Sequence, residues 1–436
     1  MNRRHASRRE FLKRTGGAVA GAIAIPYILT SKALGDDTTA PASERVTLGH
    51  IGVGGRGGGV LWEHLNQPDT QCVAVCDAFR SRREDWATRI DDFYTERAGT
   101  EQKVCTAYAD FRDLLARDDI DAVTVGTHDG WHVPVAIAAA RAGKDAYVEK
   151  PLGMSVEQDI LCREVFRERG AIFQYGTQQR SLAHCRLGCE LVRNGYIGEV
   201  ESIVVLAPQG GHGGSTDAIP VPEDLDYEMW LGSAPWSPYT ADRCTPFGCY
   251  WVYDNSIGYI AGWGAHPLDI LDWAWGSDEM MPVEYSGTGV IPTEGLFDVT
   301  ETWDVTCTYP NGVPLRFQSA GGDQTRLDGT EGWVSISRGG LDAEPKSLLS
   351  AAMKDDEIHL VQSAGQARNF VDSVKTRTPA VSPVESAARS DIISQLGDIT
   401  IRTGRTIRWD LKAETIIDDE TASRMLTRPM RAPWTL

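Results

Sequence analysis

Short apolar runs alternate with segments of helical spacing between residues 46 and 153. The runs are rich in β-branched residues and end at glycine or polar positions, as buried strands do; they cover 46–51, 72–76, 121–126 and 145–148. Between them, apolar residues recur every three or four positions, as on one face of a helix, at 60–65, 111–117 and 133–142. This alternation predicts a doubly wound parallel sheet, whose ligands bind beyond the carboxyl ends of the strands.

The pattern changes after residue 150. A helix over 156–169 precedes an apolar run at 171–175, which we expect to enter a second domain. Period-two alternation then predicts further strands, and helical spacing returns near the end of the chain. The expected strands are 201–207, 301–309, 313–319 and 332–337, and the expected helices are 185–194, 366–376 and 384–404. We therefore expect two domains, 45–170 and 171–436.

A glycine-rich turn joins the first predicted strand to the first predicted helix. It reads Gly52-Val53-Gly54-Gly55-Arg56-Gly57. The first glycine permits a tight turn, the second lets the backbone approach a pyrophosphate, and the third lets the helix pack against the strand. Free N–H groups and the helix dipole attract phosphates at this point. We expect a dinucleotide to bind Gly52, Val53, Gly54, Arg56 and Gly57.

An acidic residue follows the second predicted strand. Asp77 lies twenty residues after Gly57, where a carboxylate accepts hydrogen bonds from the adenosine ribose and repels a 2′-phosphate. It favours NAD, with NADP as the alternative because Arg80, Arg82 and Arg83 lie nearby.

Two clusters follow the next predicted strands. Thr127-His128-Asp129-Gly130-Trp131-His132 comes after 121–126, and Glu149-Lys150-Pro151-Leu152 comes after 145–148. Both lie at strand carboxyl ends, so we expect His132 and Lys150 to lie at the ligand-binding edge of the sheet.

These segments resemble the glucose–fructose oxidoreductase, inositol dehydrogenase and rhizopine-catabolism (Gfo/Idh/MocA) superfamily of NAD(P)-dependent enzymes. The resemblance continues through residues 174–181, 230–235, 404–410 and 431–434. It implies an α/β chain with an N-terminal Rossmann domain and a C-terminal α/β domain that has a large, mostly antiparallel open sheet. It also implies a homo-oligomer. The cofactor-binding residues that it implies are Thr127, His128, Trp131, His132, Glu149 and Lys150, and the substrate or nicotinamide contacts are Gln178 and Arg180.

The same resemblance indicates the chemistry. In family members a lysine, a histidine and an aspartate surround the reacting hydroxyl, and here Lys150 is the expected acid/base and His266 the group that positions or deprotonates the hydroxyl. The aspartate is expected four residues before His266, where this chain has Gly262. A structural role is the alternative for His266. Among the tryptophans between 230 and 275, one or two are expected to stack on a sugar, and Trp263 is the candidate.

A second histidine suggests a different reaction. His212 lies in the loop Gly210-Gly211-His212-Gly213-Gly214, which resembles a loop of the NAD-dependent α-N-acetylgalactosaminidases of the same superfamily. There the histidine protonates the leaving sugar oxygen. The expected function is thus an oxidoreductase acting on a sugar, cyclitol or polyol carbinol. The alternatives are a glycoside hydrolase with His212 as acid/base and a non-catalytic protein that binds NAD and sugar; for His212 itself, a surface turn is the alternative.

The N-terminal segment has the pattern of an export signal. Ser7-Arg8-Arg9-Glu10-Phe11-Leu12-Lys13 matches the twin-arginine motif, residues 16–29 form an apolar core, and Ser31-Lys32-Ala33 offers a cleavage site. We expect residues 1–33 to direct periplasmic export by the twin-arginine machinery, with 34–44 as a linker. Because free NAD is scarce outside the cytoplasm, we expect the cofactor to be carried out tightly bound.

Charge and cysteine content limit the partners. Removing 1–33, which hold seven basic residues and one acidic residue, leaves 36 basic and 60 acidic residues, a net charge of −24. Such a chain repels nucleic acid and anionic membranes, so we expect neither as a partner. The nine cysteines show no zinc-type spacing, so we expect no metal site. In an oxidising compartment the candidate disulfides are Cys185–Cys189 and Cys244–Cys249. The first is unfavourable on one helix, and buried thiols are expected in preference to either pair.

Overall fold

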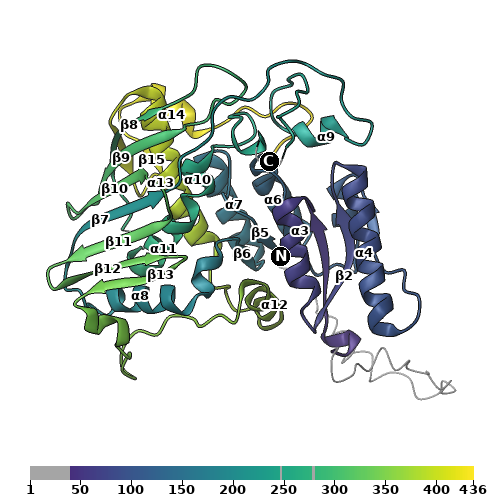
Figure 1. Cartoon of the computed structure of the whole chain (residues 1–436), viewed down its shortest axis with the longest axis horizontal. Helices are drawn as coiled ribbons and strands as arrows, with labels where there is room; N and C mark the ends of the chain where they lie inside the picture. The colour runs from purple at the N-terminus through teal and green to yellow at the C-terminus, as the bar shows by residue number, and fades with distance from the viewer. Residues whose placement is uncertain (1–39, 246–247, 277–279) are drawn as a thin grey trace, which may run out of the picture. The chain divides into compact units, whose positions relative to one another are not determined.

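The computed structural model describes residues 40–245, 248–276 and 280–436 (Figure 1). The predicted export signal, 1–33, lies outside the described residues. Of the linker, the model describes only its last part, where Ala42–Glu44 forms the short 3-10 helix η1. None of the described helices combines the length and apolar character needed to cross a bilayer.

The first domain is built on a six-stranded parallel sheet with the order β3-β2-β1-β4-β5-β6. Its central strands are almost wholly buried, as the continuous apolar runs predict for a sheet covered on both faces. The strands are β1 Val46–Ile51, β2 Thr70–Cys76, β3 Thr106–Tyr108, β4 Ala122–Val125, β5 Asp145–Val148 and β6 Phe173–Tyr175. The helices are α3 Gly55–Leu65, α4 Arg80–Ala98, α5 Phe111–Leu115, α6 His132–Arg141 and α7 Val156–Arg169. The predicted Rossmann architecture is confirmed.

Two elements that we expected in the second domain belong to the first. The run at 171–175 forms β6, which pairs in parallel with β5. Helix α12 (Gln366–Thr376) places Phe370 and Val371 in the same buried cluster as Leu48 and Leu61 of β1 and α3. Both errors have one cause: a short apolar face shows that an element is buried, not which partner buries it.

The second domain contains a nine-stranded sheet with the order β13-β12-β11-β7-β10-β9-β8-β14-β15. All neighbouring strands are antiparallel except β7 and β10, so the predicted mostly antiparallel sheet is confirmed. The strands are β7 Val200–Ala207, β8 Glu284–Val290, β9 Thr302–Thr308, β10 Pro314–Ser319, β11 Gln324–Gly329, β12 Gly332–Ser337, β13 Gly340–Glu344, β14 Ile407–Asp410 and β15 Thr415–Ile416.

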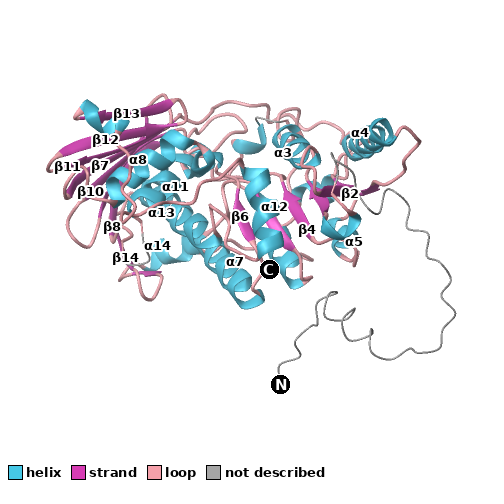
Figure 2. Ribbon diagram, turned by 90° about the horizontal axis from the view of Figure 1, so that it is seen from below, coloured by secondary structure: helices cyan, strands magenta, loops and turns pink. Residues whose placement is uncertain are grey.

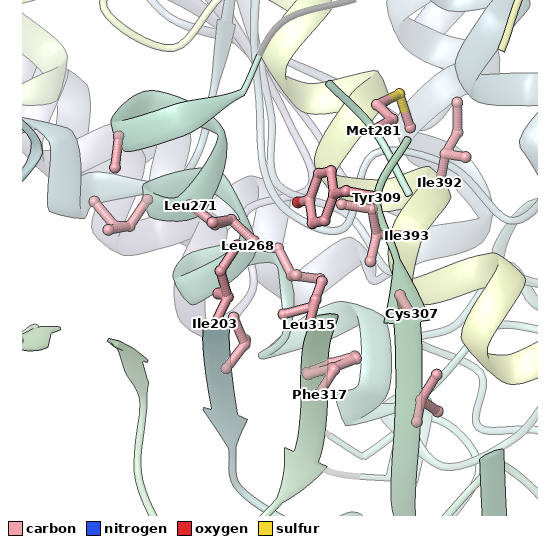
Figure 3. Packing of buried hydrophobic residues seen from close by; sticks show 14 of the residues in the cluster. Ile203, Leu268, Leu271, Met281, Cys307, Tyr309, Leu315, Phe317, Ile392 and Ile393 are labelled. Atoms are coloured by element: carbon pink, nitrogen blue, oxygen red, sulfur yellow. The ribbon is translucent and has the colours of Figure 1, made fainter. Parts of the chain in front are cut away.

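Helices cover one face of this sheet. They are α8 Ala183–Arg193, α11 Ala265–Trp275 and α13 Val384–Thr403. Figure 3 shows Leu268 and Leu271 of α11 directed at Ile203 and Leu315 of the sheet, within the largest buried apolar cluster. Figure 2 shows α13 and α7 between the two sheets, and α13 contacts α7, α11 and β8. Helix α13 therefore joins the two cores.

Candidate functional site

The glycine-rich turn adopts the conformation that its sequence requires. Gly52 has φ +78°, and a β-carbon there would lie 2.5 Å from the Thr127 backbone nitrogen. A β-carbon on Gly57 would clash with the carbonyl oxygens of Gly52 and Gly126. Helix α3 begins at Gly55 with no side chain capping its first N–H groups. The turn therefore presents a helix N-terminus suited to phosphate.

Asp77 lies where the motif predicts, at the end of β2. Its carboxylate accepts from the Val53 and Phe79 N–H groups, both at 2.9 Å, so it also fixes the turn. Burial raises its pKa, and those two hydrogen bonds oppose the shift. Arg82 stacks on the Phe79 ring at 3.8 Å and would lie 3.3 Å from a β-carbon on Gly54. A carboxylate and a guanidinium thus meet at the position that distinguishes NAD from NADP.

A cleft of about 300 Å³ lies at this edge of the parallel sheet. Its first-domain lining contains the glycine turn, the ends of β2 and β4, and Arg56, whose Nη2 is buried without a hydrogen-bond partner among the described residues. An unmatched guanidinium N–H beside a helix N-terminus fits a pyrophosphate. The predicted residues that line the cleft are Gly52, Gly54, Arg56, Asp77, Thr127, His128 and Trp131.

The opposite wall comes from the second domain. We call residues 224–245 and 248–250 the cap; it includes helix α9 (Tyr227–Leu231), visible in Figure 1 beside the top of the parallel sheet. It lines the cleft with Met229, Trp230, Cys244, Thr245, Cys249 and Tyr250. The dinucleotide site is therefore covered by residues far from the Rossmann motif in sequence.

Several hydrogen bonds attach the cap to the first domain. The Trp131 indole donates to the Met229 carbonyl at 2.9 Å, and His128 Nε2 lies 2.7 Å from the Trp230 carbonyl. The Asp226 N–H donates to the Ala78 carbonyl at 3.0 Å. Trp131 also packs edge-on against Trp434, with ring centroids 4.7 Å apart. Thus Trp131 and His128 secure the cap as well as line the cleft.

Lys150 lies beside the cleft, partly buried after β5. Its Nζ lies 5.5 Å from the centroid of the Tyr250 ring, which belongs to the cap and lines the cleft. Burial lowers the pKa of Lys150, while Glu149 and Asp129 act in the opposite direction. A lysine with a lowered pKa can exchange protons nearer neutral pH than an exposed lysine can.

Glu149 connects this lysine to the glycine turn. Its Oε1 accepts from Arg56 Nε at 2.9 Å and from Gln178 Nε2 at 3.2 Å. Glu149 itself is 3% exposed. Gln178 therefore contacts the motif glutamate, which is compatible with a place at the edge of the site.

His266 lies at the start of α11 with 3% of its surface exposed. Its pKa is well below the usual value, first because of burial and then because of Lys150 and Arg338. Nδ1 is buried and has no partner among the described residues, and the Trp263 ring lies 5.4 Å away. A β-carbon on Gly262 would meet only Pro151 Cδ at 3.9 Å and Tyr259 at 4.0 Å. Position 262 thus has room for a β-carbon.

The structure corrects the prediction for Arg180. We expected it to contact substrate or nicotinamide, but it is 3% exposed and tied to neighbouring residues. Its Nε and Nη2 donate to Asp269 at 2.8 and 2.6 Å, and Nη2 also reaches Asp272 at 3.2 Å. The family motif identifies the position of this arginine, whereas its partners come from α11, which the motif does not include.

His132 is buried away from the cleft lining. Its Nδ1 lies 2.6 Å from the Pro151 carbonyl, and its Nε2 lies 3.2 Å from the Thr127 carbonyl. It therefore holds the loop after Lys150 next to the loop after β4.

His212 is exposed and paired with an acid. Its Nδ1 lies 2.6 Å from Glu301 Oε1, and 72% of the side chain is exposed. It does not line the cleft around the glycine turn. Gly211 packs on Trp251, whose ring lies 4.3 Å from that of Tyr259. The loop is therefore backed by the aromatic residues near Tyr250.

The residues that sequence reasoning missed are non-local. Met229 and Trp230 come from the short helix α9, and Tyr250 ends the 3-10 helix Gly248–Tyr250. Only the density of aromatic residues between 227 and 275 signals them. Cys185 and Cys189 are buried thiols whose sulfurs contact the Ser337 and Ile270 carbonyls at 3.5 and 3.8 Å, as expected of unbridged cysteines.

Two family models match the chain. The NAD-binding Rossmann fold of the Gfo/Idh/MocA oxidoreductase family matches residues 46–177. The C-terminal alpha/beta domain of the same family matches residues 211–436, just over half of the chain.

Similar solved structures agree on the fold. Aldose-aldose oxidoreductase from Caulobacter crescentus is 18% identical, with a TM-score of 0.59, over 84% of this chain and 99% of that one. GenD2 from gentamicin A biosynthesis, solved in complex with NAD, is 18% identical with a TM-score of 0.58 over 86% and 98%. Myo-inositol 2-dehydrogenase from Lactobacillus plantarum is 18% identical with a TM-score of 0.55 over 84% and 99%.

Curated relatives match a shorter stretch. A glycosyl hydrolase family 109 protein from Shewanella baltica is 32% identical over 163 residues, and one from another Shewanella species is 33% identical over 167. Each match spans only 35% of this chain and 35% of the relative. With both domain models matched in order, and with a glycine turn and cleft built for a dinucleotide, the chain belongs to the Gfo/Idh/MocA family of NAD-binding oxidoreductases.

Proposed function

We propose that the protein transfers hydride between a sugar, cyclitol or polyol carbinol and a nicotinamide that stays bound between turnovers. The observation that carries the proposal is Lys150, a lysine with a lowered pKa beside the dinucleotide cleft. The similarity to an aldose-aldose oxidoreductase and a myo-inositol 2-dehydrogenase supports a polyhydroxylated substrate.

In this proposal two side chains act on the substrate hydroxyl. Neutral Lys150 accepts the hydroxyl proton during oxidation and returns it during reduction. The unmatched Nδ1 of His266 forms a hydrogen bond with the same hydroxyl and orients it. When bound, NAD supplies the hydride acceptor. Trp263, which contacts His266, offers an apolar face to the sugar ring.

The cap supports cofactor retention. It covers the cleft and is bonded to the first domain at Asp226, Met229 and Trp230. We further propose that residues 1–33 export the folded holoprotein by the twin-arginine route. Bound NAD must then be regenerated in place, which favours a paired oxidation and reduction of two substrates.

One experiment tests the main proposal. The purified holoprotein is dialysed, its bound nucleotide is quantified, and it is mixed with free sugars and polyols while absorbance at 340 nm is followed. Retained NAD and a burst of absorbance equal to the amount of protein are expected. Loss of NAD on dialysis would contradict retention, and a thermal shift with sugar but no absorbance change would favour a non-catalytic binding protein.

A glycoside hydrolase is the second candidate, because the curated relatives that match 35% of this chain are glycosyl hydrolase family 109 proteins. In this candidate His212, activated by Glu301, protonates the leaving oxygen. Release of phenol from aryl glycosides without net change at 340 nm, lost in His212→Ala and kept in His359→Ala, would favour it. His359 is a suitable control because it is also an exposed histidine.

A further inference from the structure

The loop that follows Lys150 is held by side chains rather than by regular structure. Residues 151–154 lie between β5 and α7 and belong to neither. Four side chains bind their backbone: His132 at the Pro151 carbonyl, Asp391 at the Leu152 N–H, Gln395 at the Gly153 carbonyl and Gln158 at the Met154 N–H. Side chains therefore decide where this loop lies.

Of the two α13 side chains that bind this loop, Asp391 binds the residue nearer to Lys150 in the sequence. Its Oδ2 accepts from the Leu152 N–H at 2.7 Å and from the Gly153 N–H at 3.4 Å. Its Oδ1 accepts from the Tyr175 hydroxyl at 2.6 Å. The residue is fully buried. A buried carboxylate with three donors is fixed in position, and it fixes its donors in turn.

A second carboxylate lies beside it with a different role. Asp159 of α7 is fully buried, accepts from Gln395 at 2.7 Å, and has an Oδ1 without a partner among the described residues. A β-carbon on Gly153 would clash with that oxygen. Asp159 shapes the loop by close contact, whereas the Leu152 N–H donates to Asp391, so Asp159 provides a matched comparison for Asp391.

We propose that Asp391 is a positioning residue for Lys150. By holding the Leu152 N–H, it fixes the Lys150–Pro151 peptide and so aims the lysine side chain at the cleft beside Tyr250. Asp391 belongs to α13, the helix that joins the two cores, and lies 241 residues after Lys150 in the chain. This inference rests on the proposed role of Lys150 as acid/base.

The test compares Asp391→Ala, Asp391→Asn and Asp159→Asn in the holoprotein. An asparagine retains an acceptor for the Leu152 N–H, and its NH2 group can donate to the Tyr175 hydroxyl oxygen once that hydroxyl has rotated. Asp391→Asn is therefore the rescue variant. Two readouts do not need a substrate: hydrogen exchange of the Leu152 amide, and the pH dependence of Lys150 modification by trinitrobenzenesulfonate, followed by mass spectrometry.

In Asp391→Ala the Leu152 amide is expected to exchange ~10-fold or more faster, and the Lys150 profile to move toward that of an ordinary lysine. Single-turnover hydride transfer is expected to fall by ~10²-fold, with bound NAD retained and KM little changed, because misplacement of a catalytic group acts on chemistry. Asp391→Asn and Asp159→Asn are expected to keep the wild-type Lys150 profile.

A wild-type Lys150 profile and rate in Asp391→Ala would overturn the proposal, as would an equal effect of Asp159→Asn. If Asp391→Ala does not fold, Tyr175→Phe removes one anchor of the carboxylate and is expected to shift the Lys150 profile in the same direction by less; no shift would also overturn it. If no sugar reduces bound NAD in the wild type, the proposed function fails, while exchange and modification still decide the role of Asp391.

Discussion

Arg56 Nε and Glu149 Oε1 lie 2.9 Å apart, joining the glycine turn to the strand that carries Lys150. The arginine side chain is 37% exposed and the glutamate side chain 4%. The glycine turn and the segment that carries Lys150 are thus linked through one ion pair.

Replacing Arg56 is expected to lower both the stability of the protein and its retention of NAD. Arg56→Ala leaves a buried carboxylate with one donor fewer, so the free energy of unfolding should fall by about 1–3 kcal/mol, and dialysis should remove NAD more readily. Urea unfolding and nucleotide quantification measure the two effects. Arg56→Ala combined with Glu149→Gln should recover part of the stability. Arg89→Ala, which breaks an exposed pair with Asp85, should change little; an equal loss there would contradict the prediction.

Asp77 is expected to set the preference for NAD. Asp77→Asn removes a negative charge next to Arg82 but keeps an acceptor for the turn, so the ratio of NADP to NAD affinity should rise at least ~10-fold. Calorimetric titration of the nucleotide-free protein measures this ratio. Asp224→Asn alters a carboxylate that binds Ser81 outside the cleft and should leave the ratio unchanged.

Lys150 is expected to combine catalysis with instability. Its pKa is lowered, so between the folded and unfolded values the unfolded chain binds more protons, and its contribution to stability rises with pH. Lys150→Met should reduce single-turnover oxidation ~10²–10⁴-fold. It should also raise the melting temperature at neutral pH, because methionine removes a positive charge that burial disfavours. Oxidation by the wild type should increase with pH up to the lowered pKa. Lys346→Met, at an exposed site, should alter neither quantity; a Lys150→Met protein with normal turnover would refute the assignment.

Asp391 is expected to make stability fall as pH rises from the ordinary carboxyl range to neutrality. Burial raises the pKa of Asp391 to about 7, with Tyr175 of β6, Asp159 of α7 and Asp129 as the facing groups. Because the folded protein holds this proton above the ordinary carboxyl pKa of 3.8, the stabilisation is complete only below that value and is lost progressively as pH rises from there to about 7. Asp391→Asn should flatten this loss in urea titrations at pH 4, 5.5 and 7, and the wild-type stability should change little between pH 7.5 and 8.5 on account of this group. An unchanged slope would show that another group is responsible.

The local parts of the site could be predicted from the sequence, and the non-local parts could not. The glycine turn, Asp77 and Lys150 follow from motifs in which each residue contacts its sequence neighbours or the next strand. The prediction that the run 171–175 enters the second domain is wrong, because three buried residues carry no information about their partner strand. The family resemblance places Arg180 at the substrate or nicotinamide, and this prediction is wrong because the arginine is buried in a pair with Asp269, 89 residues further along the chain. The role of Asp391 depends on a still longer separation, and nothing around residue 391 resembles a site.

The contact between Trp131 and Trp434 has a consequence for how the protein is made. Trp131 belongs to the first domain and holds the cap over the cleft, while its ring rests on a residue synthesised about 300 positions later. A growing chain can fold its parallel sheet early, yet the support behind the cap arrives only when translation has reached residue 434. A chain truncated before residue 434 would lack the ring that packs on Trp131, so the hydrogen bond from Trp131 to the cap would lose that support.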